Sequence, residues 1–353
     1  MCLAVSGTLC GTVRMKRRWW DMHSYLIEML QCPSCRGPLS WTIGEQNDDR
    51  ILDAAADCAD CRASYPIRDG IGIFLTPDLP RDDLWEEGSQ QLSELLRDRP
   101  DLEPRLMDVS LSDLGPADLF FRGLLHEERK EFDEAHEAFE RARVGLYTNE
   151  YRACSEAQFA FVIDELRAGE GPLVDLASGR GYLVLELARA MTRPIVATDF
   201  SPRVLRRDRE RLIHHNLYEA VSLLAFDARR TPFRDGAVET MTTNLGLPNI
   251  REPGKLLEEL RRTVSGRLLA ISHFFPEEDE ANRAALREHA LIESMLRKPL
   301  ITAFADAGWQ ASTRNEIRGR ARPTPVGEVI EGAGIDALPV AETLLEWCVI
   351  DAS

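Results

Sequence analysis

The 353-residue sequence contains no run of about 18 consecutive apolar residues, so it predicts no transmembrane helix. It also lacks the order of segments typical of a secretory signal, because the basic cluster at residues 14–18 follows the mildly apolar residues 1–13. The eight cysteines form two Cys-x-x-Cys pairs and four scattered residues, which without a signal indicates a reducing compartment. We therefore expect a cytoplasmic protein, and interpret residues 1–21 as a loose N-terminal extension.

An excess of positive charge is also missing. The formal net charge is −16, and residues 81–170 alone contribute −12 of it. Strong acidity disfavours nonspecific binding to nucleic acid, although it leaves room for a local basic face elsewhere.

The length of the chain fits two or three domains, and its periodicity divides it into three regions after the extension. Residues 22–78 combine a short helix at 23–30 with strand-like segments and an Asp69-Gly70 hairpin turn. Residues 82–150 have apolar residues at helical spacing, which predicts an acidic helical linker or cap with a helical hairpin at 117–143. Residues 151–353 alternate strands and helices, which predicts an α/β domain with a mainly parallel sheet. The strands are expected at 173–176, 194–198, 221–226, 238–243, 267–272 and near 310–315, with helices at 182–190, after Ser201 and at 253–264, and a largely helical remainder.

Two cysteine pairs are spaced as metal ligands. Cys32 and Cys35 are followed after 22 residues by Cys58 and Cys61. Each Cys-x-x-Cys turn presents two thiolates, and four thiolates close a tetrahedral zinc site with no open position, so we expect the zinc to be structural. A region of about 55 residues has little core, and metal binding would stabilise it. Two redox pairs or four free thiols are the alternatives, although redox pairs usually occur singly.

The residues around these cysteines resemble a known family. The sequence from Cys-Pro-Ser-Cys at 32–35 to Tyr-Pro-Ile-Arg-Asp-Gly-Ile at 65–71 is similar to the small zinc-ribbon family that activates tRNA and release-factor methyltransferases. Ala63 departs from that pattern, which has glycine there. The resemblance implies a zinc ribbon that serves a methyltransferase, either as a partner or as a fused domain.

Residues 173–181 indicate a nucleotide-type cofactor site. A hydrophobic strand ends at Asp175 and leads through Ala177 to the turn Gly179-Arg180-Gly181, where small residues permit a close approach to the backbone. The next two strands end at Asp199-Phe200 and at Asp227-Ala228, and ligands bind at the ends of adjacent parallel strands. A nicotinamide dinucleotide is the alternative ligand, but it favours a third glycine where this chain has Val184.

This series of strand ends resembles the class I methyltransferases that use S-adenosylmethionine. The resemblance covers about residues 155–320 and implies a Rossmann-like, seven-stranded sheet with one antiparallel strand. It implies that Asp175, Gly179 and Gly181 line the methionine part of the cofactor, that Asp199 binds the ribose and that Asp227 binds the adenine. Ala177 replaces the first glycine of the family motif, and we expect the loop to keep its shape.

Two residues are candidates for the chemistry. Asn244 follows the fourth strand, where the family faces the methyl group, and we expect a polar contact to the cofactor or acceptor; a turn residue that satisfies its own backbone is the alternative. His273, at the end of the fifth strand, is a candidate general base or a plain strand-end histidine. Tyr147 and Tyr151 precede the domain and would stack on the cofactor or shape the acceptor pocket, or simply pack. Methyl transfer chiefly requires positioning, so a dedicated base is not essential.

Three functions follow from these patterns. The leading hypothesis is a methyltransferase for a small-molecule acceptor. The second is an RNA methyltransferase whose zinc ribbon binds nucleic acid, although acidic residues outnumber basic ones in residues 22–78 and no basic aromatic stripe occurs. The third is a non-catalytic scaffold or methyltransferase-activating protein, against which the three retained aspartates argue. The Asn-Pro-Pro-aromatic motif of amino-group methyltransferases is absent from the sequence, so exocyclic base amines are not indicated as the acceptor. The sequence leaves the acceptor atom and the oligomeric state open.

Overall fold

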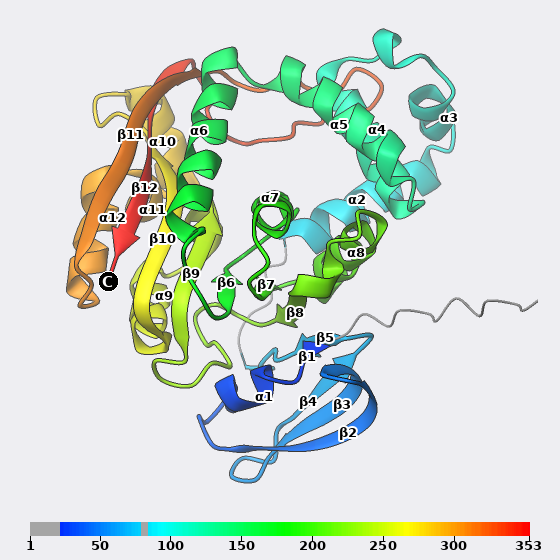
Figure 1. The fold of residues 1–353 in the computed structure, drawn as a ribbon. Coiled ribbons are helices and arrows are strands. Elements are labelled where there is room, and N and C mark those ends of the chain that lie inside the picture. The colour runs from blue at the N-terminus through cyan, green and yellow to red at the C-terminus, as the bar shows by residue number, and fades with distance from the viewer. Residues whose placement is uncertain (1–21, 79–83) are drawn as a thin grey trace, which may run out of the picture.

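The computed structural model describes residues 22–78 and 84–353, and Figure 1 shows their arrangement. The proposed extension at residues 1–21 lies outside the described residues. The described strands form one mixed sheet of 12 strands, ordered β1-β3-β4-β5-β8-β7-β6-β9-β10-β12-β11, with β2 paired to β3. The expected α/β half and the N-terminal half therefore share one continuous sheet.

Seven strands of this sheet form the expected α/β half. Only β12 runs antiparallel to its two neighbours, so the predicted seven-stranded, mostly parallel sheet is confirmed. The strands are β6 (Leu173–Asp175), β7 (Ile195–Asp199), β8 (Val221–Ala225), β9 (Val238–Asn244), β10 (Val264–Phe274), β11 (Ala311–Ala321) and β12 (Thr343–Ala352).

Helices cover both faces of these strands. One face packs on α6 (Asn149–Leu166), α7 (Tyr182–Ala190) and α8 (Pro202–His214), and the other on α9 (Pro253–Thr263) and α12 (Arg297–Asp306). The short helices α10 (Glu280–Glu288) and α11 (Ile292–Met295) follow β10. Ser201 accepts a hydrogen bond from the Val204 N–H and begins α8, as the Ser-Pro pair predicts.

The expectation of a helical remainder after residue 272 was wrong at the C-terminus. Residues 322–342 form neither helix nor strand, and β12 then inserts between β10 and β11. Local periodicity did not reveal this strand because its stability comes from pairing with two partners that lie far away in the sequence.

The N-terminal half is a small antiparallel sheet. It contains β1 (Met22–His23), β2 (Leu39–Asn47), β3 (Arg50–Cys58), β4 (Ser64–Arg68) and β5 (Ile71–Ile73). The expected helix at 23–30 is only the single turn α1 (Leu26–Met29), because Met22 and His23 pair with β3 instead. Asp69 and Gly70 both have positive φ, as the predicted hairpin turn between β4 and β5 requires.

β5 joins the two halves. It pairs in parallel with β8, with Ile71 opposite Leu223 and Ile73 opposite Ala225. Gly72 between them is packed closely, since a Cβ there would lie 2.7 Å from Leu224 Cδ2 and 2.9 Å from Phe74 Cε2. The ribbon thus adds strands to the edge of the larger sheet.

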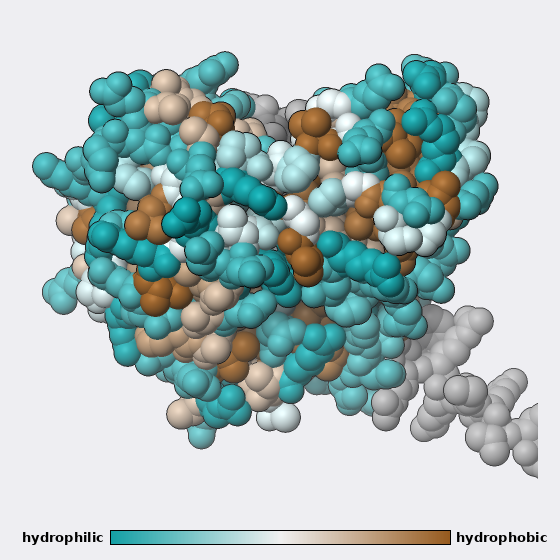
Figure 2. Space-filling view, turned by 90° about the horizontal axis from the view of Figure 1, so that it is seen from above, coloured by the Kyte–Doolittle hydropathy of each residue, from teal (hydrophilic) through white to brown (hydrophobic). Residues whose placement is uncertain are grey.

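Residues 84–146 form a helical cap. It contains α2 (Leu84–Asp98), α3 (Leu102–Met107), α4 (Pro116–Glu128) and α5 (Phe132–Leu146), and the predicted hairpin is formed by α4 and α5. In this cap α3, α4 and α5 lie above α8, and α2 lies beside it (Figure 1). The C-terminal loop fastens the cap, because the buried Asp118 carboxylate accepts hydrogen bonds from the backbone N–H groups of Glu328, Val329 and Ile330. Seen from above, hydrophilic residues dominate the surface and hydrophobic ones form small separate groups (Figure 2).

Candidate cofactor and metal sites

The turn between β6 and α7 has the backbone that its small residues predict. Ala177, Gly179 and Gly181 all have positive φ, at 52°, 54° and 61°. Glycine adopts this conformation freely, whereas alanine is strained in it. The loop therefore keeps its shape with Ala177, at a cost to the stability of the fold.

Asp175 ends β6 beneath this turn. It is buried, and its Oδ1 accepts a hydrogen bond from the Thr242 hydroxyl at 2.8 Å. Burial raises the pKa of the Asp175 carboxyl to about 7. Thr242 was not among the residues expected from the sequence; its position next to Asp175 follows from the β6–β9 pairing.

Asp199 ends the neighbouring strand β7 and lies against the glycine turn. Its Oδ2 accepts a hydrogen bond from the Gly179 N–H and its Oδ1 one from the Ser201 N–H, both at 2.9 Å. The carboxylate and the turn therefore hold each other in place, at the carboxyl end of the sheet where such folds bind ligands.

Asp227 follows β8 at the same edge. Arg229 surrounds its carboxylate through the backbone N–H at 2.9 Å, Nε at 3.0 Å and Nη2 at 2.7 Å. The sequence did not predict this contact, which fixes the carboxylate and leaves other lone pairs of its oxygens to accept further bonds. Ala228 is buried beside it, and Phe200 is half-buried after β7. The structure thus brings the three predicted aspartates to one edge of the sheet.

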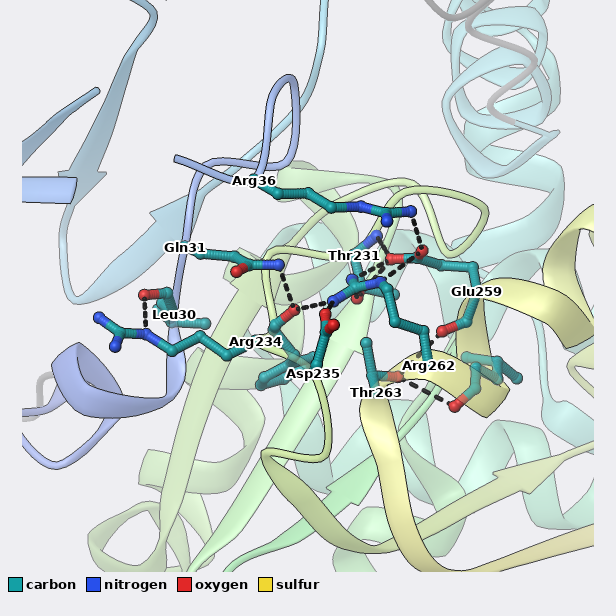
Figure 3. Close-up of polar contacts among 11 residues, drawn as sticks. Leu30, Gln31, Arg36, Thr231, Arg234, Asp235, Glu259, Arg262 and Thr263 are labelled. Atoms are coloured by element: carbon teal, nitrogen blue, oxygen red, sulfur yellow. Dashed lines mark hydrogen bonds and ion pairs between the residues drawn. The ribbon is translucent and has the colours of Figure 1, made fainter. Parts of the chain in front are cut away.

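The zinc ribbon holds the loop that follows Asp227. Gln31 Nε2 donates to the Phe233 carbonyl at 3.2 Å, and Arg234 Nε donates to the Leu30 carbonyl at 3.0 Å. Figure 3 shows these bonds, together with the Arg36–Glu259 ion pair, between the ribbon, this loop and α9. The 3.7 Å separation of that pair and the exposure of Arg36 make it a weak contribution beside the backbone bonds.

Asn244 and His273 lie on one face of the sheet. Asn244 is level with Ile271 on β10, and His273 two residues further on is level with Trp347 on β12. Asn244 Oδ1, His273 Nδ1 and Trp347 Nε1 are all buried without a hydrogen-bond partner in residues 22–78 and 84–353. Burial lowers the pKa of His273 to about 4. Trp347 was not predicted as a site residue because the strand that carries it, β12, was not predicted.

The rings of His273 and Trp347 pack among other aromatic side chains. Tyr147 stacks on Tyr151 with ring centroids 4.8 Å apart, and Tyr151 meets Trp347 edge-on at 5.0 Å. The His273 ring is 4.9 Å from Trp347 and 6.2 Å from Tyr151. Of the two predicted tyrosines, Tyr151 therefore lies beside His273, and Tyr147 stacks on Tyr151.

The four predicted cysteine ligands converge. Their sulfur atoms all lie within 4.8 Å of one another, with Cys32 Sγ 3.5 Å from Cys61 Sγ and Cys35 Sγ 3.4 Å from Cys58 Sγ. Tetrahedral zinc with bonds of about 2.3 Å separates its sulfur ligands by roughly 3.8 Å, so the cluster is compatible with a structural zinc ion. Gly37 N–H points at Cys35 Sγ at 3.4 Å, a donor that favours a thiolate.

Comparisons with known proteins agree with both halves. Residues 174–267 match the methyltransferase domain family, and residues 23–70 match the Trm112p-like protein family. A ubiquinone/menaquinone biosynthesis C-methyltransferase of Methylococcus capsulatus is 31% identical over 118 residues, which is 32% of this chain and 47% of that protein. A demethylmenaquinone methyltransferase of Clavibacter sepedonicus is 34% identical over 147 residues, which is 40% of this chain and 56% of that protein. The chain spans about half the length of these curated relatives.

Solved structures are similar at lower identity. The YcgJ protein of Bacillus subtilis aligns with a TM-score of 0.45 and 16% identity, over 56% of this chain and 97% of that one. A SAM dependent methyltransferase of Aquifex aeolicus aligns with a TM-score of 0.38 and 17% identity, over 59% of this chain and 92% of that one.

The fold is a Rossmann-like methyltransferase sheet. More particularly, the sheet contains the segment at residues 174–267 that matches the methyltransferase domain family, and it is extended by the segment at residues 23–70 that matches the Trm112p-like family. Among the helices of residues 22–78 and 84–353, none has the length and apolar character needed to cross a bilayer.

Proposed function

We propose that this chain is an S-adenosylmethionine-dependent methyltransferase for a small organic acceptor. The observation that carries the proposal is the set of three aspartates at one edge of the sheet, beside a left-handed glycine turn, within the segment that matches the methyltransferase family. The polar and backbone groups there fit the cofactor, since its ribose and adenine present donors and carboxylates accept them.

Each residue of this edge has a proposed role. Asp175 and the turn from Ala177 through Gly179 to Gly181 would hold the methionine part, and Asp199 would accept hydrogen bonds from the ribose. Asp227 would accept from the adenine amino group, flanked by Phe200 and Ala228. When bound, the cofactor supplies a methyl group on a sulfonium whose leaving group is neutral, so the chain's own task is chiefly to position the acceptor.

Asn244, His273 and Trp347 would contact the acceptor. Their unpaired atoms provide a carbonyl acceptor, an imidazole nitrogen and an indole donor, the last two among aromatic rings. With its pKa near 4, His273 is neutral at pH 7 and accepts a hydrogen bond, but it is a weak general base. We therefore assign it to orienting an acceptor hydroxyl rather than to removing a proton in a separate step.

The domain limits follow the same assignment. We propose that residues 22–78 are the zinc ribbon, 82–150 the acidic cap and 151–353 the catalytic domain. In this arrangement the zinc has a structural role, since four cysteines leave no position for a substrate. The ribbon would serve its own catalytic domain, whose sheet it extends.

A small acceptor is favoured over RNA. The matched curated relatives are named as methyltransferases of quinone biosynthesis, and the cap beside the site carries most of the negative charge. Acidic surfaces repel a polyanion. An RNA methyltransferase is the second candidate because the Trm112p-like family accompanies such enzymes.

Labelled methyl transfer distinguishes the two candidates. Zinc-loaded protein is incubated with methyl-tritiated S-adenosylmethionine and either a panel of hydroxylated aromatic compounds or unmodified tRNA and rRNA. Label extracted into organic solvent, and reduced in the Asn244→Ala variant, is the expected result. Label only in the RNA would replace the small-molecule assignment by the second candidate.

A further inference from the structure

The turn Gly179-Arg180-Gly181, called the cofactor turn below, places one large side chain in the cap. Arg180, between Gly179 and Gly181, is only 5% exposed. Its guanidinium lies over the Phe139 ring at 4.0 Å and over the Phe120 ring at 5.4 Å, so α4 and α5 both contact it. Arginine stacks well on aromatic faces, and desolvation strengthens that attraction. A residue of the cofactor motif is thus also part of the core of the cap.

Glu127, in the last turn of α4, is the charge partner of this arginine. Its Oε1 lies 3.0 Å from Arg180 Nη2, and the side chain is 4% exposed. Two arginines of α8 share the same carboxylate, Arg211 at 3.6 Å and Arg207 at 3.7 Å. Removing one member of a buried ionic group leaves the remaining charges uncompensated, which is costly.

The same two arginines hold the backbone of the turn. Arg207 Nη2 donates to the Gly179 carbonyl at 3.4 Å, and Arg211 Nη2 donates to the Arg180 carbonyl. The Gly179 N–H in turn donates to Asp199. A continuous path of contacts therefore runs from Glu127 in the cap, through the arginines and the turn, to the proposed ribose ligand.

Pairs of polar side chains make up much of the remaining contact between the cap and α8. Along one stripe of α8, Arg203 pairs with Glu128 at 2.8 Å, Glu210 with Lys130 at 3.2 Å and His214 with Asp133 at 3.0 Å. These three pairs are partly exposed, unlike the pair of Glu127 and Arg180, and exposed pairs contribute little each. The buried group around Glu127 is therefore the part of the contact that fixes the turn.

We propose that Arg180 is a positioning residue through which docking of the helical cap sets the conformation of the cofactor turn, with Glu127 as its partner. The inference rests on the proposed function for its meaning, since the turn would bind S-adenosylmethionine. It predicts that a substitution in the cap, at a residue with no contact to the three aspartates, weakens cofactor binding.

Calorimetric titration with S-adenosylmethionine tests this coupling. Glu127→Gln and Arg180→Gln are each expected to raise the Kd about tenfold, within the usual range of coupling between sites. The double variant is expected to bind no more weakly than the weaker single variant, because the two residues act through one contact. Glu128→Gln, one residue further along α4, is the matched control and is expected to bind as the wild type does.

Amide hydrogen exchange separates positioning from general stability. In protein without cofactor, at a temperature where all variants are folded, the peptide spanning 176–183 is expected to exchange faster in Glu127→Gln and not in Glu128→Gln. Arg180→Lys, which keeps a cation for Glu127, is expected to recover part of the affinity.

A Kd for Glu127→Gln within twofold of wild type, with unchanged exchange at 176–183, would overturn the inference. If the wild type itself fails to bind S-adenosylmethionine, the proposed function falls. The exchange experiment alone then decides whether the cap positions the turn.

Discussion

Ala177 adopts a left-handed backbone conformation that an alanine side chain disfavours. It has φ of 52°, and the left-handed region costs an L residue roughly 1–2 kcal/mol. Glycine relieves that strain but loses more entropy on folding, by about 0.4–1 kcal/mol. Ala177→Gly is therefore expected to raise the free energy of unfolding by about 0.5–1 kcal/mol, measured by urea denaturation.

The matched control for this substitution is Ala284→Gly. Ala284 is exposed in the interior of α10, where the same change is expected to destabilise by about 1 kcal/mol. Equal destabilisation at both sites would show that Ala177 is not strained.

Asp175 makes stability depend on pH. Its folded pKa, about 7, is above its unfolded value of 3.8, so its stabilising contribution is present below 3.8 and is lost as pH rises through 7. Asp175→Asn removes this dependence. The variant is therefore expected to gain about 2–3 kcal/mol relative to wild type between pH 5 and pH 8, at roughly 1.4 kcal/mol per unit of pH below 7.

Denaturation at the two pH values measures that gain. The exposed Asp164, which pairs with exposed Arg167 at 3.3 Å, provides the control Asp164→Asn, for which no such gain is expected. A stability difference between wild type and Asp175→Asn that is the same at pH 5 and pH 8 would refute the buried, proton-binding state of Asp175.

At the scale of elements, the pairing between β5 and β8 joins the strands of the ribbon to the larger sheet. A Cβ at Gly72 would approach Leu224 and Phe74 to within 3 Å. Overpacking of this kind costs about 1–3 kcal/mol, so Gly72→Ala is expected to lower the free energy of unfolding by that amount. Gly254→Ala, in α9 with nothing within 4 Å of the new methyl group, is expected to be neutral or stabilising. Similar values for the two variants would contradict the close pairing.

The elements that were predicted from the sequence differ from those that were missed in how local their signals are. The strand ends carrying Asp175, Asp199 and Asp227 were predicted because each follows a local hydrophobic run with a turn after it. β12 and its Trp347 were missed because their pairing is long-range, and the β5–β8 pairing has no local signal at all. The contact of Arg229 with Asp227, two residues apart, depends on a loop conformation that spacing does not determine.

At the scale of the molecule, metal and cofactor sites are linked through the shared sheet. The ribbon pairs with β8 and holds the loop after Asp227, so loss of the ribbon's structure removes support from the proposed adenine site. Chelation of zinc is therefore expected to lower the melting temperature and to weaken S-adenosylmethionine binding, and added zinc is expected to restore both. An unchanged melting temperature after verified removal of zinc would contradict this linkage.

The central claim is that the edge formed by Asp175, Asp199 and Asp227 binds S-adenosylmethionine. Calorimetry on zinc-loaded protein tests it directly, with Asp199→Asn as the variant and Asp164→Asn as its control. Hydrogen bonds to a charged group contribute about 1.5–3 kcal/mol, so the account predicts saturable wild-type binding that Asp199→Asn weakens roughly 10- to 100-fold while Asp164→Asn does not. Absence of binding by the wild type, or equal binding by Asp199→Asn, would contradict the account.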